Sequence, residues 1–298
     1  MVRPAHFGYN EETALNNAFQ TQDDSLSQKE VQQRAVREFD AFVEKLRSAG
    51  VDVIVVEDTD TPAKPDAVFP NNWITFHEDG RVVTYPMNAP TRRLERREDI
   101  IESIGNRFRM GDHLRFEHYE EVDMYLEGTG SLILDRPNRV AYACLSPRTS
   151  EHLLDDFCDK FGYEKLAFIA VDGNSQEIYH TNVMMALGET FVVICLESVR
   201  AKGERNRLLG KFAATNKEVI EISLEQMMAF AGNMLQVRSQ DGTPYLAMSG
   251  QAFQSLRPEQ VQQIEKHSKI LHSPLDVIEK YGGGSARCMM AEVFLPEK

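Results

Sequence analysis

Several features that mark whole classes of protein are missing from this chain of 298 residues. No apolar run approaches the roughly 20 residues needed to cross a bilayer, and the first residues, Met1 to His6, lack the apolar core of a secretory signal. The four cysteines include no C-x-x-C pair, which argues against a disulfide framework and a cysteine zinc site. These absences predict a cytoplasmic protein with reduced thiols.

Positive charge is also scarce, because 33 Lys and Arg residues face 46 Asp and Glu residues, giving a formal net charge of -13. Phosphate backbones and anionic membranes require Lys and Arg for neutralisation. We therefore expect neither nucleic acid nor a membrane as partner. A small-molecule substrate remains compatible, since a pocket can carry its own local charge, and the sequence leaves open whether the chain forms a homo-oligomer.

One order of elements recurs along the chain, namely hairpin, helix and strand, with a period of roughly 50–60 residues. Hairpins are predicted at 72–86, 131–145, 182–196 and 233–248; helices at 28–49, 91–104, 149–161, 203–214, 258–267 and 274–280; and strands at 51–56 (buried), 166–171, 219–222, 269–271 and from about Arg287. Such recurrence favours a repeat architecture such as a propeller over a doubly wound sheet. No linker interrupts the pattern, so we predict one domain over residues 1–298.

Cys288 follows the glycine run Gly282-Gly283-Gly284 and the residues Ser285-Ala286-Arg287. Three consecutive glycines are costly to order, so a special backbone path is expected there, and glycine-rich turns let backbone N–H groups converge on a ligand. An intracellular cysteine is more often a small buried hydrophobe, which is our interpretation of the other three cysteines. The residues before Cys288 are polar and rich in glycine, so for this cysteine a nucleophile and a small buried hydrophobe are about equally favoured.

A nucleophilic cysteine needs a proton-transfer partner, and His180 is the candidate because it opens a predicted strand. A structural histidine is the alternative. Glu127 lies between an apolar residue and a glycine at the start of another predicted strand, an unusual place for a carboxylate, which makes it a candidate site residue. A residue of an exposed turn is the more common explanation of such a pattern. His113 and His118 have no third ligand at useful spacing, so no metal site is predicted.

A polar group lies beside the only tryptophan, where Asp66, Asn71 and Asn72 occur within Pro65 to Trp73. Adjacent asparagines are compatible with plain turn chemistry. They are equally compatible with amide ligands for a polar substrate.

Taken together, these segments resemble the guanidino-group-modifying superfamily, which includes arginine deiminases, dimethylarginine dimethylaminohydrolases and glycine amidinotransferases. Within it, the chain looks most like the bacterial amidinotransferase-related citrulline-utilisation hydrolases. The resemblance covers nearly the whole chain and implies an α/β fold, a five-bladed α/β propeller of ββαβ units (the pentein fold), without a cofactor. It also implies catalytic roles for Cys288 as nucleophile, His180 as general acid/base and Glu127 as the active-site carboxylate.

The resemblance further implies substrate-binding residues. The Pro-Asp-x-Val-Phe segment of the family matches Asp66 through Phe69. Segments similar to those of the dimethylarginine hydrolases make Arg92, Arg93 and Arg148 candidates for holding a substrate carboxylate.

Two departures from the deiminase pattern bear on the substrate, because Asn72 and Asn182 stand where that pattern carries aspartates. A guanidinium offers only donors and a positive charge, which suits carboxylates. A ureido group is neutral and has a carbonyl acceptor, to which an asparagine can donate. The pair therefore favours a ureido substrate such as citrulline, unless each asparagine merely caps a turn or Asn71 takes the place of Asn72.

The sequence thus predicts a cysteine-nucleophile hydrolase that cleaves a C–N bond through a covalent S-carbamoyl or S-amidino intermediate. An amidinotransferase or an arginine or methylarginine deiminase would use the same residues. A propeller that only binds a ligand is the non-enzymatic alternative.

Overall fold

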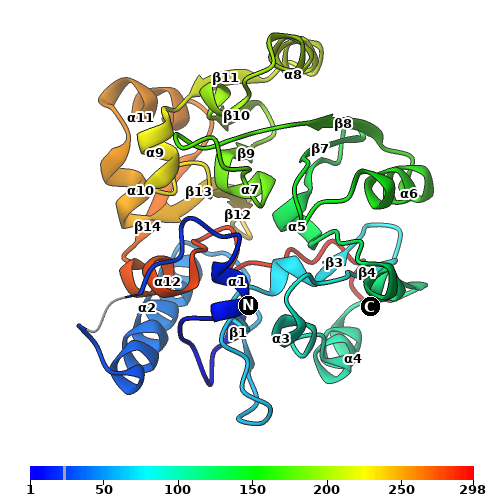
Figure 1. Ribbon diagram of the computed structural model, residues 1–298, viewed down its shortest axis with the longest axis vertical. Helices are drawn as coiled ribbons and strands as arrows, with labels where there is room; N and C mark the ends of the chain where they lie inside the picture. Colours follow the sequence, from blue (N-terminus) through cyan, green and yellow to red (C-terminus); the bar gives the residue numbers. More distant parts are fainter. Residues whose placement is uncertain (23–24) are drawn as a thin grey trace.

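A computed structural model describes residues 1–22 and 25–298 of the chain. Within this part the strands form five small sheets. Figure 1 shows these sheets arranged around a common centre, with the longer helices on the outside. The architecture is the predicted five-bladed α/β propeller. No helix in the described part is long and apolar enough to span a membrane.

Four of the sheets are three-stranded and share one topology. In each, the first two strands form an antiparallel hairpin, and a helical crossover places the third strand parallel to the second. The strands are β3 (Ile74–Phe76), β4 (Val82–Thr84), β5 (His113–Arg115), β6 (Ile133–Asp135), β7 (Val140–Cys144), β8 (Glu164–Phe168), β9 (Met185–Leu187), β10 (Phe191–Ile194), β11 (Glu218–Glu221), β12 (Leu235–Arg238), β13 (Pro244–Ser249) and β14 (Lys269–Ser273).

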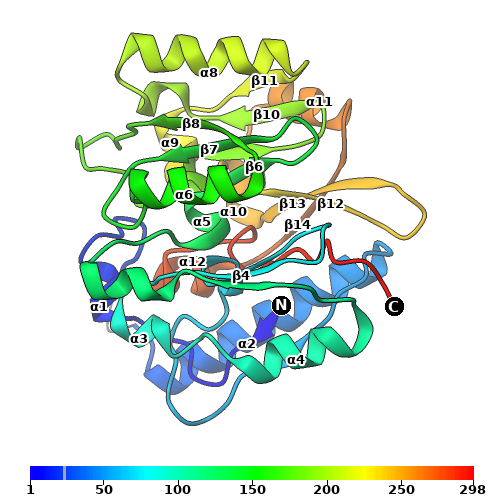
Figure 2. The ribbon, with the colours of Figure 1, turned by 90° about the vertical axis from the view of Figure 1, so that its right-hand side faces the viewer.

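The crossover helices lie on the outer side of these blades. They are α3 (Pro90–Arg93), α4 (Glu98–Arg107), α6 (Glu151–Phe161), α8 (Lys202–Ala214), α10 (Gly250–Ser255) and α11 (Pro258–Glu265). Helix α9 (Leu224–Met228) lies instead between β11 and β12 and connects two blades. Figure 2 shows α8 at the outer edge of the β9–β11 blade, as does Figure 1. The single helix predicted at 91–104 is wrong, because the chain forms the separate helices α3 and α4 there.

The fifth sheet has only two strands, β1 (Val2–Arg3) and β2 (Val56–Glu57), which run parallel and are joined through α2 (Gln28–Ser48). The predicted buried strand at 51–56 is wrong: only Val56 belongs to a strand, and no residue of this segment is fully buried. The physical reason is that β1 pairs only with Val56 and Glu57, while Val51 to Ile54 border a cavity.

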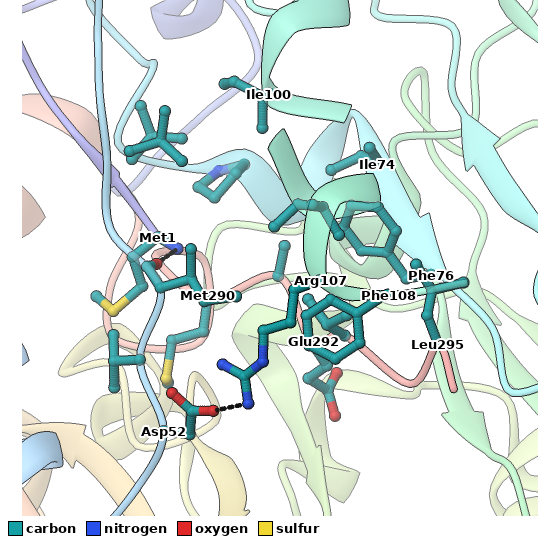
Figure 3. A pocket seen from close by; sticks show the side chains of 18 of the residues that line it. Met1, Asp52, Ile74, Phe76, Ile100, Arg107, Phe108, Met290, Glu292 and Leu295 are labelled. Atoms are coloured by element: carbon teal, nitrogen blue, oxygen red, sulfur yellow. Dashed lines mark hydrogen bonds and ion pairs between the residues drawn. The ribbon is translucent and has the colours of Figure 1, made fainter. Parts of the chain in front are cut away.

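That cavity is apolar, has a volume of about 410 Å³ and separates β1 from the C-terminal segment. Figure 3 shows Met1, Met290 and Leu295 around it, with the ion pair between Arg107 and Asp52 at one side. The strand predicted from about Arg287 is also wrong, since the described part of the chain has no strand after β14 and residues 286–289 form a turn.

Helix α2 packs its apolar face on α12 (Asp276–Gly282), the helix that leads into the glycine run. Phe39 and Phe42 of α2 and Leu275 and Ile278 beside them are almost fully buried in one apolar cluster. Burying each such side chain contributes roughly 1.5–3 kcal/mol. The packing of α2 therefore fixes the end of α12 from which the glycine run departs.

Short helical turns precede the first strands of three blades: η1 (Pro70–Asn72), α5 (Gly128–Ser131) and α7 (Thr181–Met184). Asn182 was predicted to begin a strand, but it lies in α7, and the strand starts at Met185. These turns are buried. They contain Asn72 and Asn182, and Glu127 and His180 are the residues just before α5 and α7.

Candidate active site

A small buried cavity brings together residues that are far apart in the sequence. Cys288, His180, Asp66, Asn72, Arg92 and Arg148 line it, together with Gly282 to Gly284. Asn72 comes from η1, His180 is the residue before α7, and Cys288 follows the glycine run after α12. One site thus receives residues from the blades of β3–β5 (Asn72), β6–β8 (Arg148) and β9–β11 (His180), and from the C-terminal turn. A propeller geometry allows this convergence.

Glu127 lies directly behind His180 and is fully buried. Its Oε2 is 2.7 Å from Nε2 of His180 and 3.7 Å from Nη1 of Arg148, while Oε1 accepts a hydrogen bond of 2.9 Å from the backbone N–H of Asn88. Burial alone would raise the pKa of Glu127, but Arg148 and His180 outweigh burial and hold this pKa below its ordinary range. Glu127 is therefore an ionised acceptor near neutral pH.

Because Glu127 only accepts, the proton of neutral His180 resides on Nε2, and Nδ1 is left as an acceptor. Burial lowers the pKa of His180, and the hydrogen bond and charge of Glu127 oppose this effect. His180 is thus a neutral base held by a carboxylate, the arrangement required of a proton-transfer residue.

Gly130 is needed where the His180 ring approaches Asn72. A Cβ atom on Gly130 would lie 2.7 Å from Nδ1 of His180 and 2.3 Å from Nδ2 of Asn72. Gly128 has a φ of +46°, and a Cβ there would lie 2.3 Å from the carbonyl oxygen of Asn71. The Glu127-Gly-Thr-Gly segment is therefore explained by close packing of one turn against another.

Cys288 is buried, and its sulfur is held by two side-chain amides. Sγ accepts hydrogen bonds from Nδ2 of Asn182 at 3.3 Å and from Nδ2 of Asn233 at 3.2 Å. Hydrogen-bond donors stabilise a thiolate over a thiol. The glycine run is also accounted for: Gly283 ends α12 with a φ of +64°, and a Cβ on Gly284 would come within 3.0 Å of the Phe69 ring.

Asn72 has a fixed orientation because its Oδ1 accepts a hydrogen bond of 2.9 Å from Nη1 of Arg92. Its Nδ2 has no hydrogen-bond partner among the described residues, and neither does Oδ1 of Asn182. Asn71 lies beside the site rather than in it, since its amide is 3.4 Å from Thr129 and its side chain does not line the cavity. Two buried polar atoms therefore lack partners. One is the donor Nδ2 of Asn72, which lines the cavity, and the other is the acceptor Oδ1 of Asn182, whose Nδ2 contacts Cys288.

Asp66 and Arg92 belong to one buried charge cluster. Arg92 forms an ion pair of 2.8 Å with Glu95 and lies 3.9 Å from Asp66. Burial raises the pKa of Asp66, and the charge of Arg92 and a hydrogen bond of 2.7 Å from Asn10 oppose it. Both residues line the cavity, but most N–H groups of Arg92 already donate to partners within the protein.

Arg148 lines the same cavity, and the N-terminal segment occupies its guanidinium. Nε donates to Oδ1 of Asn16 at 2.8 Å and Nη2 donates to the carbonyl of Thr13 at 2.8 Å. Arg93 lies elsewhere: it forms an ion pair of 3.3 Å with Glu120, and it does not line the cavity. Of the three predicted arginines, the structure therefore places Arg92 and Arg148 in the site.

Two parts of the site were missed from the sequence. Asn233 is one, although its position just before β12 corresponds to that of Asn72 and Asn182 before their own strands. The other is the segment around α1 (Glu11–Ala14), which covers the cavity with Thr13 and Asn17. Its sequence has no hydrophobic period or glycine run that would have indicated this role.

Comparison with known proteins finds one family model that matches nearly the whole chain. The family model described as "N,N dimethylarginine dimethylhydrolase, eukaryotic" matches residues 3–295. No curated protein sequence matches the chain.

Among solved structures, the chain is similar to the N-terminal domain of ArgZ bound to substrate, an arginine dihydrolase from the ornithine-ammonia cycle in cyanobacteria (TM-score 0.75, 18% identity, 99% of this chain and 98% of that one). It is also similar to unliganded AgrE (TM-score 0.74, 20% identity), of which it spans 39% while all of its own length is covered. A dimethylarginine dimethylaminohydrolase adduct with S-methyl-L-thiocitrulline is a further match (TM-score 0.65, 16% identity, 97% and 96% covered).

Proposed function

The chain belongs to the eukaryotic N,N dimethylarginine dimethylhydrolase family, and from this membership we propose that it is a hydrolase that cleaves a C–N bond in the guanidino or ureido group of a small amino acid. One observation carries the proposal. Cys288, with two amide donors on its sulfur, lines the same buried cavity as His180, which Glu127 holds at 2.7 Å.

The proposed reaction has two steps. In the first, Sγ of Cys288 attacks the central carbon of the substrate, a C–S bond forms, and the C–N bond to the departing nitrogen breaks. Nδ1 of His180 accepts the thiol proton and delivers it to that nitrogen, while Glu127 holds the ring through Nε2. In the second step His180 takes a proton from water and the resulting hydroxide attacks the same carbon. The C–S bond then breaks, and His180 returns that proton to the departing sulfur, which restores Cys288 and neutral His180.

The finer proposal is that the substrate carries a neutral ureido group, as citrulline does. Arg92 fixes Oδ1 of Asn72, so the unpartnered Nδ2 is available as a donor for a carbonyl oxygen. The unpartnered Oδ1 of Asn182 is an acceptor for an N–H group. Aspartates at both positions would offer only acceptors, and an unpaired buried contact with the carbonyl oxygen would cost about 1–3 kcal/mol.

A guanidino substrate such as arginine is the second candidate. It is favoured by Asp66, a carboxylate lining the cavity that would suit a cationic group. The arginine dihydrolase ArgZ shares the fold. For a citrulline substrate, we assign Asp66 instead to the α-ammonium group.

Arg148 is the proposed site for the substrate carboxylate, because an arginine fork matches a carboxylate in two parallel hydrogen bonds. Oδ1 of Asn16 now accepts from both Nε and Nη2 of Arg148. The substrate carboxylate would take the place of this amide oxygen, so the segment around α1 must shift when substrate binds.

The test is a comparison of citrulline, arginine and methylated arginines as substrates, with products identified by mass spectrometry. We expect ornithine, ammonia and carbon dioxide from citrulline, with a higher kcat/KM than for arginine. Adding a second amine and searching for its carbamoylated or amidinated product distinguishes a transferase from a hydrolase. A preference for arginine over citrulline would show that the asparagines do not select a neutral group.

A variant sharpens this test. Asn72→Asp combined with Asn182→Asp should lower kcat/KM for citrulline about tenfold or more and strengthen competition by arginine through charge-assisted hydrogen bonds. Asn206→Asp, an identical change at an exposed position of α8, is the control and should alter neither value. Because Asn182→Asp also removes a donor from the Cys288 sulfur, a loss of kcat for both substrates is expected. Competition by arginine that is no stronger in the double variant than in the wild type would contradict the proposed role in substrate choice.

A further inference from the structure

We propose that Asn233 is a further catalytic residue, which holds the thiolate of Cys288 through its side-chain amide. This inference rests on the proposed function, because it concerns the nucleophile of that same reaction. Asn233 is fully buried, and its Nδ2 lies 3.2 Å from the Cys288 sulfur.

The amide of Asn233 has no freedom to turn around. Its Oδ1 accepts a hydrogen bond of 3.0 Å from the backbone N–H of Arg287, the residue before the nucleophile. Nδ2 has two hydrogens: one donates to the carbonyl of Asn182 at 2.8 Å, and the other points at Sγ. Rotating the amide by half a turn would place an oxygen against that carbonyl and an N–H₂ against the Arg287 N–H, so the donor must face the sulfur.

Asn233 therefore performs two tasks with one side chain. Through Oδ1 it positions the backbone just before Cys288, and through Nδ2 it stabilises the negative sulfur. The second task is shared with Asn182, whose Nδ2 lies 3.3 Å from the same sulfur. Hydrogen bonds to a charged acceptor are roughly twice as strong as neutral ones, which makes both donors relevant to thiolate formation.

The backbone around Cys288 supports the proposed role of Asn233. In the described part of the chain Cys288 is not followed by a strand, so no ladder of backbone hydrogen bonds fixes its position. The hydrogen bond from Arg287 to Asn233 connects this turn to the entry of the β12–β14 blade. A residue with a merely structural role would not need a donor aimed at the sulfur.

The experiment measures the reactivity of Cys288 rather than turnover, so its result does not depend on the identity of the substrate. Asn233→Asp keeps the shape and the acceptor for the Arg287 N–H but replaces the donor by an oxygen. The rate of alkylation of Cys288 by iodoacetamide is followed from pH 5 to pH 10 by peptide mass spectrometry. Cys144, which is fully buried and has its pKa raised by burial to about 12, is the internal reference.

We expect Asn233→Asp to slow alkylation of Cys288 at pH 7 about tenfold or more and to move the midpoint of the pH profile upward by about one pH unit or more. Asn233→Ala, which removes the donor without adding charge, should give a smaller shift in the same direction. With the true substrate, both variants should lose kcat by a larger factor than they change KM.

Gln226→Met is the matched control, because Gln226 is also a buried amide with hydrogen bonds to Ser255 and Gln260 but lies outside the cavity. It should lower the melting temperature and leave the pH profile of Cys288 unchanged. An unchanged midpoint in Asn233→Asp and Asn233→Ala would overturn the proposal, as would an equal shift in the control. If no ureido or guanidino compound is turned over, the proposed function fails while the alkylation result still decides the role of Asn233.

Discussion

The proposed catalytic residues come from two kinds of region in this propeller. Glu127 and His180 precede short turns that lead directly into three-stranded blades through β6 and β9. Cys288 lies on the fifth side, where β1 and β2 form only a two-stranded sheet and no strand follows the nucleophile in the described part of the chain. An apolar cavity of about 410 Å³ lies between β1 and the C-terminal segment.

The two parts of the site therefore differ in whether a strand ladder continues from them. The turns of Glu127 and His180 pack against each other and continue into buried ladders. The turn of Cys288 is buried too, because Ala286 and Met289 belong to an apolar cluster. Its polar contacts are single ones: Arg287 donates to the carbonyl of Met290 at 2.9 Å and forms an ion pair of 3.0 Å with Glu292, and Ser285 donates to Glu279 at 2.5 Å. No strand ladder fixes this turn in the described part of the chain, so we expect the loss of one contact to displace Cys288 more easily than His180.

The largest effect is expected where the two regions meet in the reaction. Cys288→Ser should lower kcat by at least about a thousandfold with an unchanged circular dichroism spectrum, because a hydroxyl is a far weaker nucleophile than a thiolate near neutral pH. His180→Ala should be nearly as damaging, and the double variant little worse than either single one, since the two residues act as a unit. If the loss of kcat in the double variant equals the product of the two single losses, the two residues act independently.

A smaller effect is expected within the well-packed region. Gly130→Ala inserts a methyl group between Asn72 and His180 and should lower kcat by about a hundredfold. Gly210→Ala is the matched control, because a Cβ on this exposed glycine of α8 meets nothing within 4 Å. The control should keep full activity and gain up to about 1 kcal/mol in the free energy of unfolding. A fully active Gly130→Ala enzyme would mean that this packing does not position the histidine.

The repeat pattern was predictable because each blade repeats one local signal, a hairpin followed by an amphipathic helix and a strand. Helix 28–49, for example, was predicted almost to its ends, and a capping box at Ser27 with Glu30 marks its start. The fifth blade was not predictable, since its strands lie at positions 2–3 and 56–57 and are joined only by the long crossover through α2. A pattern of apolar residues at 51–56 cannot reveal that only Val56 finds a strand partner, in β1.

The candidate site, too, contains residues that the sequence could predict and residues that it could not. Cys288, His180 and Glu127 could be singled out because each combines a reactive group with unusual neighbours, and the structure places Cys288 and His180 at the cavity with Glu127 behind His180. Arg93 could not be distinguished from Arg92, because adjacent positions on one helical turn point in different directions. Asn233 could be found only by comparing equivalent positions of different blades.

The smallest expected effect concerns the support of the Cys288 turn by Glu279. Burial raises the pKa of this carboxyl to about 7; hydrogen bonds from Ser249 and Ser285 oppose the shift, and the charges of Asp276 and Glu38 add to it. Its folded pKa is therefore above its unfolded value, so the stabilisation is complete at pH values below about 4.5 and is lost as the pH rises through 7.

Glu279→Gln replaces this carboxyl by a permanently neutral amide that can still accept the Ser285 hydrogen bond. The variant should match the wild type in the free energy of unfolding at pH 5 and exceed it by about 1–2 kcal/mol at pH 8. Urea titrations at both pH values test this, with Glu44→Gln on the exposed side of α2 as the control. Because Ser285, which precedes the Cys288 turn, donates to this carboxyl, we also expect the alkylation rate of Cys288 to vary less with pH above 7 in Glu279→Gln than in the wild type. A stability difference that is the same at pH 5 and pH 8 would mean that the carboxyl is already ionised in the folded protein and that the Cys288 turn tolerates its charge.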